Sequence, residues 1–140
     1  MLPPNESSFE FECVGDKTGK KYDGTFTVKC VLANHETIEV ASRAERYNGG
    51  VATLAGYYKL FNRAIAEAEV RIKFDPVKKR QMAPSWWIDS DAGRELLDQN
   101  VVFDLYYKIV EQEKDWNDKV KRGAAEAEER AKATAAAPKA

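Results

Sequence analysis

The sequence predicts an α+β domain in which an N-terminal β-hairpin packs on a bundle of three to four α-helices, followed by a low-complexity tail that is helical or disordered. Three observations lead to this prediction. Apolar and polar residues alternate over residues 7–32, which is the period of strands with one solvent-facing side. Apolar residues recur every three or four positions over residues 52–68 and 98–122, as they do in partly buried helices. Bulky apolar residues almost disappear after Gly123.

The hairpin is predicted together with its register. The stretch DKTG at residues 16–19 has the composition of a tight turn, with a glycine placed for positive φ. If the turn is centred in that stretch, Phe9 faces Phe26 and Cys13 faces Tyr22. The apolar residues that alternate along the two strands then share one face, which makes the register self-consistent. That face consists of Phe9, Phe11, Cys13, Tyr22, Phe26, Val28 and Cys30.

Glycine and cysteine positions give two further expectations for the hairpin. Gly24 interrupts the second strand and predicts a β-bulge. In the predicted register Cys13 and Cys30 lie too far apart for a disulfide, so both are expected to be free and to pack as small apolar residues. The single histidine, His35, has no partner cluster that would complete a zinc site. The sequence therefore predicts no metal and no cofactor.

Two helices are predicted between the hairpin and a basic loop. The first is capped by Asn34, runs to about Tyr47 and is ended by the Asn-Gly-Gly sequence at residues 48–50. The second covers about residues 52–68, and its expected buried stripe consists of Leu54, Tyr57, Tyr58, Phe61, Ile65 and Ala68. The alternating residues after it fit either the end of this helix or a short strand, and we favour a helix that continues to about Ile72.

The last predicted helix is the longest. Asp98 is a suitable cap for its start. One face of this helix carries Val102, Leu105, Tyr106, Ile109, Glu113, Trp116 and Val120. From Gly123 onward the sequence AAEAEERAKATAAAPKA cannot bury enough apolar surface to offset the entropy lost on ordering. We therefore divide the chain into one α+β domain over residues 1–122 and a tail over residues 123–140.

Charge and motif content argue against several classes of function. A net charge of −1 creates no field that would attract nucleic acid or an anionic membrane. No apolar run approaches the roughly 20 residues of a membrane helix, and residues 1–6 lack the features of a signal peptide. The carboxylates of Asp89, Asp91, Glu95 and Asp98 cluster near a helix start, where they are favoured structurally. No histidine, lysine or nucleophile is spaced to share acid–base chemistry with them, so we predict no catalytic residues and a cytoplasmic protein that is not an enzyme.

The adjacent tryptophans Trp86 and Trp87 are the main candidates for partner binding. They follow Pro84 in the stretch MAPSWWIDSD. One member of such a pair can seal the core while its neighbour points away, and an exposed tryptophan is the kind of anchor that protein interfaces concentrate. Trp116 is interpreted as a second core seal. A sugar-binding platform would need several aromatics on one strand face together with amide and acid side chains, and the sequence lacks that arrangement.

The order of these motifs resembles that of the small tail assembly chaperones of long-tailed bacteriophages. The resemblance covers roughly Phe9 to Val120 and is carried by FEFE, YDGTFTVK, FNRAIAEAEVRI, PSWWIDSD and LLDQNVVFDLYYKIVEQEKDW. By this resemblance Trp86 and Trp87 match a proline–aromatic turn of the family. The start of the family's last helix is matched by Asp98, Asn100, Val101 and Val102, and its body by Leu105, Tyr106, Val110, Glu113 and Trp116. The N-terminal hairpin departs from the pattern, because only some members have one.

The resemblance implies a non-enzymatic chaperone in the cytoplasm of a phage-infected host cell. Such a protein binds the tape measure protein and assists assembly of the tail tube protein, and it can form homo-oligomers. Its partner-binding residues would include Trp86, Trp87, Tyr106 and Trp116. A programmed ribosomal frameshift often extends the shorter product in this family, and the tripeptide at residues 137–139 is compatible with a slippery sequence in the gene. The rival interpretations are a structural virion component, such as a minor tail or head decoration protein, and another protein–protein adaptor.

Overall fold

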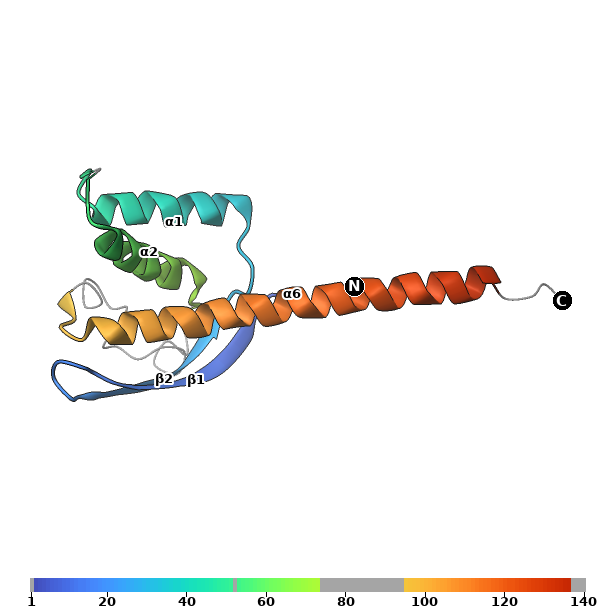
Figure 1. Ribbon diagram of the computed structural model, residues 1–140, viewed down its shortest axis with the longest axis horizontal. Helices are drawn as coiled ribbons and strands as arrows, with labels where there is room; N and C mark the ends of the chain where they lie inside the picture. Colours follow the sequence, from blue (N-terminus) through green and yellow to red (C-terminus); the bar gives the residue numbers. More distant parts are fainter. Residues whose placement is uncertain (1, 52, 74–94, 137–140) are drawn as a thin grey trace.

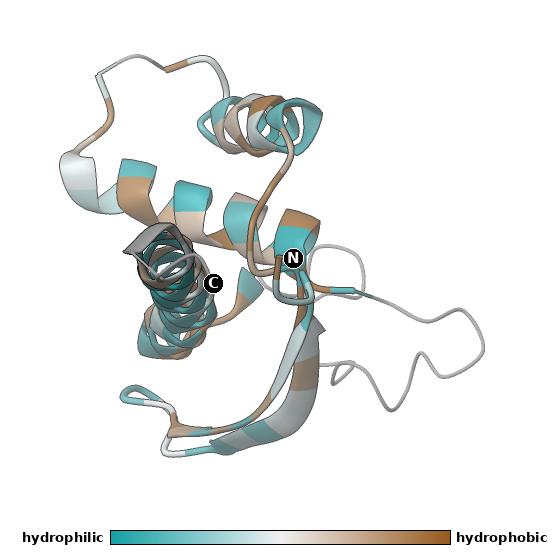
Figure 2. Ribbon diagram, turned by 90° about the vertical axis from the view of Figure 1, so that its right-hand side faces the viewer, coloured by the Kyte–Doolittle hydropathy of each residue, from teal (hydrophilic) through white to brown (hydrophobic). Residues whose placement is uncertain are grey.

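The predicted fold class is confirmed by a computed structural model, which describes residues 2–51, 53–73 and 95–136. Its elements are β1 (Ser7–Val14), β2 (Lys21–Val28), α1 (Asn34–Tyr47), α2 (Gly56–Arg71) and α6 (Gln99–Ala136). Figure 1 shows α1 lying on α2 and α2 lying on α6, with the hairpin on the other side of α6. The view along α6 in Figure 2 shows the same order, so the first half of α6 is enclosed between α2 and the hairpin.

The hairpin has the predicted register. Phe9 pairs with Phe26 and Cys13 pairs with Tyr22 in an antiparallel ladder, and Gly19 in the turn has φ 71°. The bulge predicted at Gly24 is wrong, because Gly24 pairs with Phe11 in an unbroken ladder. The absent side chain at Gly24 serves packing instead. The ring of Phe11 reaches diagonally to Phe26, where the two rings make an edge contact at 6.0 Å between centroids.

One core joins the hairpin, α2 and α6. It is formed by Phe11, Cys13, Tyr22, Phe26, Val28, Phe61, Ala64, Ile65, Ala68, Ile72, Val101, Val102, Leu105 and Ile109. Polar contacts fix β1 along α6, since Ser7 Oγ donates to Gln112 Oε1 at 2.6 Å and Asn100 Nδ2 donates to the Val14 carbonyl at 2.9 Å. Both cysteines are free and buried, as predicted. The single apolar face of the hairpin is therefore covered mainly by α6.

The first two helices differ from the prediction at their starts. The cap of α1 is Ala33, whose backbone N–H is bound by the carboxylate of Glu36 at 3.1 Å, and Asn34 is already helical. The end of α1 after Tyr47 is as predicted, with Gly49 and Gly50 at φ 63° and 74°. The helix α2 begins at Gly56, later than expected, and Ala55 precedes it with non-helical dihedrals.

The chain leaves α2 through a short extended contact. The helix ends at Arg71, and Ile72 adopts extended dihedrals and forms a single bridge with Val28. Two backbone hydrogen bonds flank the bridge, from Lys29 N to the Arg71 carbonyl and from Lys73 N to the Thr27 carbonyl, both at 2.8 Å. Both sequence-based alternatives for this segment therefore hold in part, since the helix reaches Arg71 and a strand-like contact follows at once.

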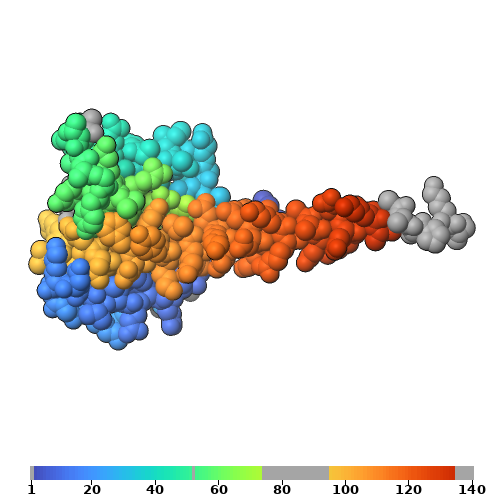
Figure 3. Space-filling view, viewed as in Figure 1, coloured from blue at the N-terminus to red at the C-terminus, as the bar shows by residue number. Residues whose placement is uncertain are grey.

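The helix α6 runs without a break for 38 residues, past Gly123 to Ala136. At ~1.5 Å per residue its length is about 57 Å, and Figure 3 shows its second half extending beyond the rest of the molecule. The low-complexity segment is thus helical as far as residue 136. The packed first half supplies the helix nucleus, and alanine, glutamate, lysine and arginine extend it at low cost. No helix in the described part of the chain is long and apolar enough to cross a membrane.

Asp98 joins the hairpin turn to the start of α6. Its side chain is completely buried, at 0% exposure. The carboxylate accepts hydrogen bonds from Lys17 N and Thr18 N, both at 2.9 Å, from the Thr18 hydroxyl and from the Tyr22 hydroxyl at 2.8 Å. Asp98 does stand at the helix start, but its side chain caps the turn between the strands, not its own helix. The Thr18 hydroxyl, the Tyr22 hydroxyl and the two backbone amides lower the pKa of Asp98 from 3.8 to about 2.

Gly15 leaves the space that the Asp98 carboxylate occupies. An ideal Cβ at position 15 would lie 2.2 Å from both Cγ and Oδ2 of Asp98. The Gly15 amide also donates to the Lys20 carbonyl at 2.8 Å, which closes the turn. The glycine is therefore required by the close approach of a buried side chain whose position is fixed by four hydrogen bonds.

We predict that Gly15→Ala lowers the free energy of unfolding by about 1–3 kcal/mol, as overpacking of a filled site does. Gly123→Ala is the matched control, because a Cβ there meets nothing within 4 Å and the residue lies in mid-helix. The control should leave the free energy of unfolding unchanged or raise it by up to about 1 kcal/mol. Urea denaturation and far-ultraviolet circular dichroism measure both effects. Equal stability of Gly15→Ala and the unaltered protein would contradict the Asp98 packing.

Candidate partner-binding surface

The predicted partner-binding residues do not form one patch among the described residues. Trp86 and Trp87 lie outside the described residues, as do Asp89 and Asp91. Their predicted roles stay predictions.

Tyr106 and Trp116 both lie on α6, separated by ten residues or about 15 Å along the helix axis. Both are half-buried. Tyr106 packs against the core and has its pKa raised by burial and by the charge of Glu67. The indole Nε1 of Trp116 donates to the Pro3 carbonyl at 3.2 Å. Trp116 thus holds the N-terminal segment on α6, whereas Tyr106 belongs to the surface described next.

Exposed aromatic and apolar side chains gather where the start of α2 meets α6. We call this the aromatic surface, and it consists of Tyr57, Tyr58, Leu60, Phe103, Tyr106 and Tyr107. Ring contacts join its aromatic members in two groups: the Tyr57 ring lies 5.5 Å from both Tyr58 and Phe103, and the Tyr106 ring lies 5.9 Å from Tyr107. Phe103 also contacts buried Phe61 at 5.7 Å. The surface is therefore continuous with the core beneath it.

Sequence analysis placed Tyr57 and Tyr58 in the buried stripe of α2, and that placement is wrong. Tyr57 is 49% exposed, Tyr58 53%, Leu60 46% and Tyr107 61%. The stretch GYYKLF puts four apolar residues within five positions, and at about 100° per residue they spread over more than one helix face. Phe61 takes the inner position, so the others face outward. The Tyr57 hydroxyl remains polar and donates to Gln99 Oε1 at 2.7 Å.

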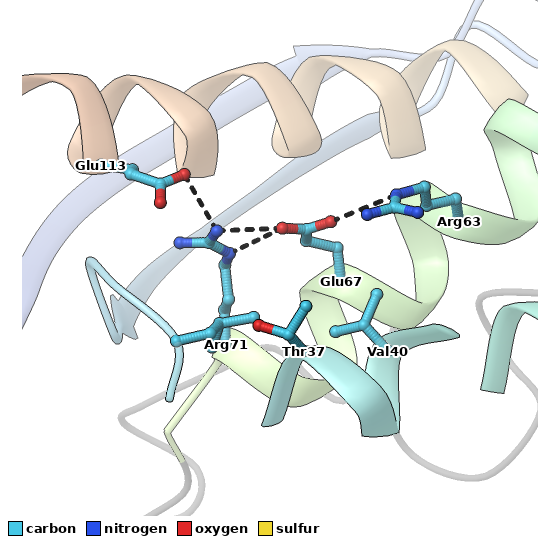
Figure 4. A pocket seen from close by; sticks show the side chains of 7 residues that line it. Thr37, Val40, Arg63, Glu67, Arg71 and Glu113 are labelled. Carbon is cyan, nitrogen blue, oxygen red and sulfur yellow. Dashed lines mark hydrogen bonds and ion pairs between the residues drawn. The ribbon is translucent and has the colours of Figure 1, made fainter. Parts of the chain in front are cut away.

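A polar cleft of about 230 Å³ lies between α1, α2 and α6. It is lined by Leu32, Thr37, Val40, Arg63, Glu67, Arg71 and Glu113. Figure 4 shows that its charged groups alternate in sign: Glu113 contacts Arg71 at 3.0 Å, Arg71 contacts Glu67 at 2.9 Å, and Glu67 contacts Arg63 at 3.8 Å. The charge of Glu67 in this cleft also raises the pKa of Tyr106.

The charges in this cleft are occupied by one another. Arg71 is 4% exposed, and it also donates to the Cys30 carbonyl at 2.6 Å, so it links α2, α6 and the segment before α1. Such a network holds helices in register more readily than it binds a ligand. The buried thiol of Cys13 is held protonated, since burial and the nearby Asp104 carboxylate raise its pKa to about 12. Among the described residues, no group of three or more acidic, histidine or cysteine side chains could hold a metal ion.

Comparison of the chain with protein-family models, with curated proteins and with solved structures gives no match. The candidate site is therefore identified from the residue types and their arrangement in the structure. Of the features described above, the aromatic surface has the composition that protein interfaces concentrate, because tyrosines with adjoining apolar side chains lie exposed on a packed scaffold.

Proposed function

We propose that this chain is a non-enzymatic protein-binding factor that engages its partner through the aromatic surface. The exposure of Tyr57, Tyr58, Leu60 and Tyr107 on two adjacent helices carries this proposal. Covering the exposed half of such side chains contributes roughly 25 cal/mol per Å² of apolar area removed from water. Their tyrosine hydroxyls keep the surface compatible with solvent while the partner is absent.

The packing beneath the surface favours binding without rearrangement. Phe103 contacts both Tyr57 on the surface and Phe61 in the core, so the exposed rings stand on fixed side chains. A platform of this kind loses little conformational entropy when a partner binds. Charged residues lie beside it, including Arg63 on α2, which pairs with the buried Glu67, and Lys108 on α6, which pairs with the exposed Glu111. A charged rim of this kind favours specific and reversible association.

The specific form that we propose is a phage tail assembly chaperone acting in the host cytoplasm. It would cover apolar surface of the unassembled tape measure protein and assist assembly of the tail tube protein, and would be displaced as the tube grows. This identity is supported by the resemblance of the motif order between Phe9 and Val120. In the same proposal Trp86, Trp87, Tyr106 and Trp116 contribute to partner binding, and Tyr106 is the one that belongs to the aromatic surface.

We predict that the double variant Tyr57→Ala/Tyr107→Ala weakens binding to the tape measure protein of the same phage by about tenfold or more, equivalent to ~1.4 kcal/mol. The free energy of unfolding should change by only about 0.5–1 kcal/mol, because both side chains are largely exposed. Isothermal titration calorimetry with the tape measure protein and urea denaturation measure the two quantities.

Ile38→Ala is the matched control, since Ile38 is 61% exposed on α1, as exposed as Tyr107, and lies outside the aromatic surface. It should bind normally. Normal binding by the double variant would rule out the aromatic surface as the docking site. If the unaltered protein shows no affinity for the tape measure protein, the chaperone identity is wrong.

The protein composition of the mature particle distinguishes the chaperone from the rival interpretation, a permanent virion component. We predict that mass spectrometry of purified virions finds this chain absent or far below stoichiometric amounts, because a chaperone is released on assembly. Expression of the native gene region should also give a second, larger product that shares this N-terminus. Abundant copies in mature particles, with no overlapping downstream reading frame, would favour a minor tail or head decoration protein.

A further inference from the structure

The stretch of α6 that follows Val120 has no intramolecular cover. Residues 121–134 are all exposed, and Figure 3 shows this part of the helix extending away from the other elements. The ion pairs found here lie within the helix itself, from Glu126 to Arg130 at 3.9 Å and from Glu128 to Lys132 at 3.5 Å. The side chains of this segment are therefore available to a partner, and the order of charges along the sequence decides which partner fits.

Charges along this segment alternate in blocks. An acidic pair, Asp115 and Asp118, is followed by a basic block, then an acidic block, then a basic pair. The basic block is Lys119, Lys121 and Arg122; the acidic block is Glu126, Glu128 and Glu129; and the basic pair is Arg130 and Lys132. When this order is reversed, the basic block of one helix falls opposite the acidic block of the other. The pattern is therefore complementary to itself in the antiparallel direction.

We propose that the exposed half of α6 pairs antiparallel with the same segment of a second copy of this chain. This inference is independent of the proposed function, because it uses neither the aromatic surface nor the phage resemblance. With the two-fold axis between Gly123 and Ala124, Lys119 of one copy lies on the same flank of the pair as Glu126 of the other, and Lys121 lies on the opposite flank beside Glu128. Asp115 lies on the flank of Arg130, Lys114 and Lys132 are a like-charged match on the other flank, and Asp118 and Glu129 point away from the contact. A parallel pair in register would instead bring each block beside its own sign.

The apolar positions fit the same register. Val120 of one copy lies opposite Ala127 of the other, and Gly123 lies opposite Ala124. The spacing from Val120 through Gly123 and Ala127 to Ala131 keeps these residues on one side of the helix. Their small side chains permit close approach of two helices, and the charge order selects a second copy in the antiparallel direction as the partner.

The size of the contact predicts weak, concentration-dependent association. The overlap of residues 115–132 is about 27 Å long at ~1.5 Å per residue. Two helices in contact over this length bury an area near the low end of the range for specific interfaces. The two folded bodies would stand at opposite ends of the paired helices, because α6 leaves each body in one direction. A dimer of this form would carry two separated copies of every surface of the body, which raises avidity for a partner with repeated sites.

Charge reversal tests the proposal in the full chain. The variant Lys119→Glu/Lys121→Glu makes all four facing positions acidic, and Glu126→Lys/Glu128→Lys makes all four basic. Sedimentation velocity should show a monomer–dimer equilibrium for the unaltered protein. Each variant alone should need about tenfold or more higher concentration to dimerise, and an equimolar mixture should restore dimers. Circular dichroism checks that both variants keep their helix content.

Three results would overturn the proposal: an unaltered protein that is monomeric at every concentration, a single variant that dimerises as well as the unaltered protein, or a mixture that fails to associate. Disulfide trapping gives a second test that leaves the charges intact. Ala124→Cys should cross-link to itself, whereas Ala131→Cys should not, because the two copies of residue 131 lie about 22 Å apart in this register. The native thiols are buried and do not compete. Cross-linking at both positions indicates a parallel pair, and cross-linking at neither indicates no pair.

Discussion

The carboxylate of Asp98 is the point at which the hairpin turn and the start of α6 are held together. It is a buried charge, and all its acceptor capacity is directed at Lys17, Thr18 and Tyr22 of the hairpin. A two-stranded hairpin is marginal in water on its own and needs a surface to pack on. Asp98 fixes where on α6 that packing begins, and Gly15 gives it room. A buried, fully satisfied charge of this kind specifies register, since any shift leaves it unpaired.

A second buried charge acts further along the same helix. Arg71 binds Glu113, which lies 15 residues or about 22 Å beyond Asp98. Between these two polar contacts α6 buries Val101, Val102, Leu105 and Ile109, while its neighbouring face carries the half-buried ring of Phe103 and the exposed ring of Tyr107. The first half of α6 is thus fixed on two sides, and this rigidity is what makes the aromatic surface a suitable docking platform. The second half of α6 contributes no residue to the core and carries alternating blocks of charge.

Local pattern was sufficient to predict much of this architecture. The alternation that places Phe9 opposite Phe26 depends only on the strand period and a turn at residues 16–19, and the helix α1 ends at its glycines as expected. The helix continues through Gly123 because one glycine costs only ~1 kcal/mol relative to alanine in a good helix-forming sequence.

Contacts between residues far apart in the sequence could not be predicted from local pattern. A carboxylate before a helix looks the same whether it caps that helix or binds a turn 80 residues away, so the partners of Asp98 were missed. The exposure of Tyr57 and Tyr58 follows from which of four neighbouring apolar residues faces α6, and the tertiary contact of Phe61 with Phe103 decides that. A count of apolar residues per helix face would have shown that they could not all be buried.

The most direct test of the account is the pH dependence of stability in the unaltered protein and in Asp98→Asn. The pKa of Asp98 falls from 3.8 to about 2 on folding, so its contribution should be complete above 3.8 and be lost as the pH falls toward about 2. Asp98→Asn removes the charge and leaves one acceptor oxygen in place of two. This variant should therefore be clearly less stable than the unaltered protein at about pH 5. Urea denaturation should show the difference between the two proteins shrinking steadily as the pH approaches 2. A difference that stays constant across this range, or that is absent at about pH 5, would contradict the central role given to the Asp98 carboxylate.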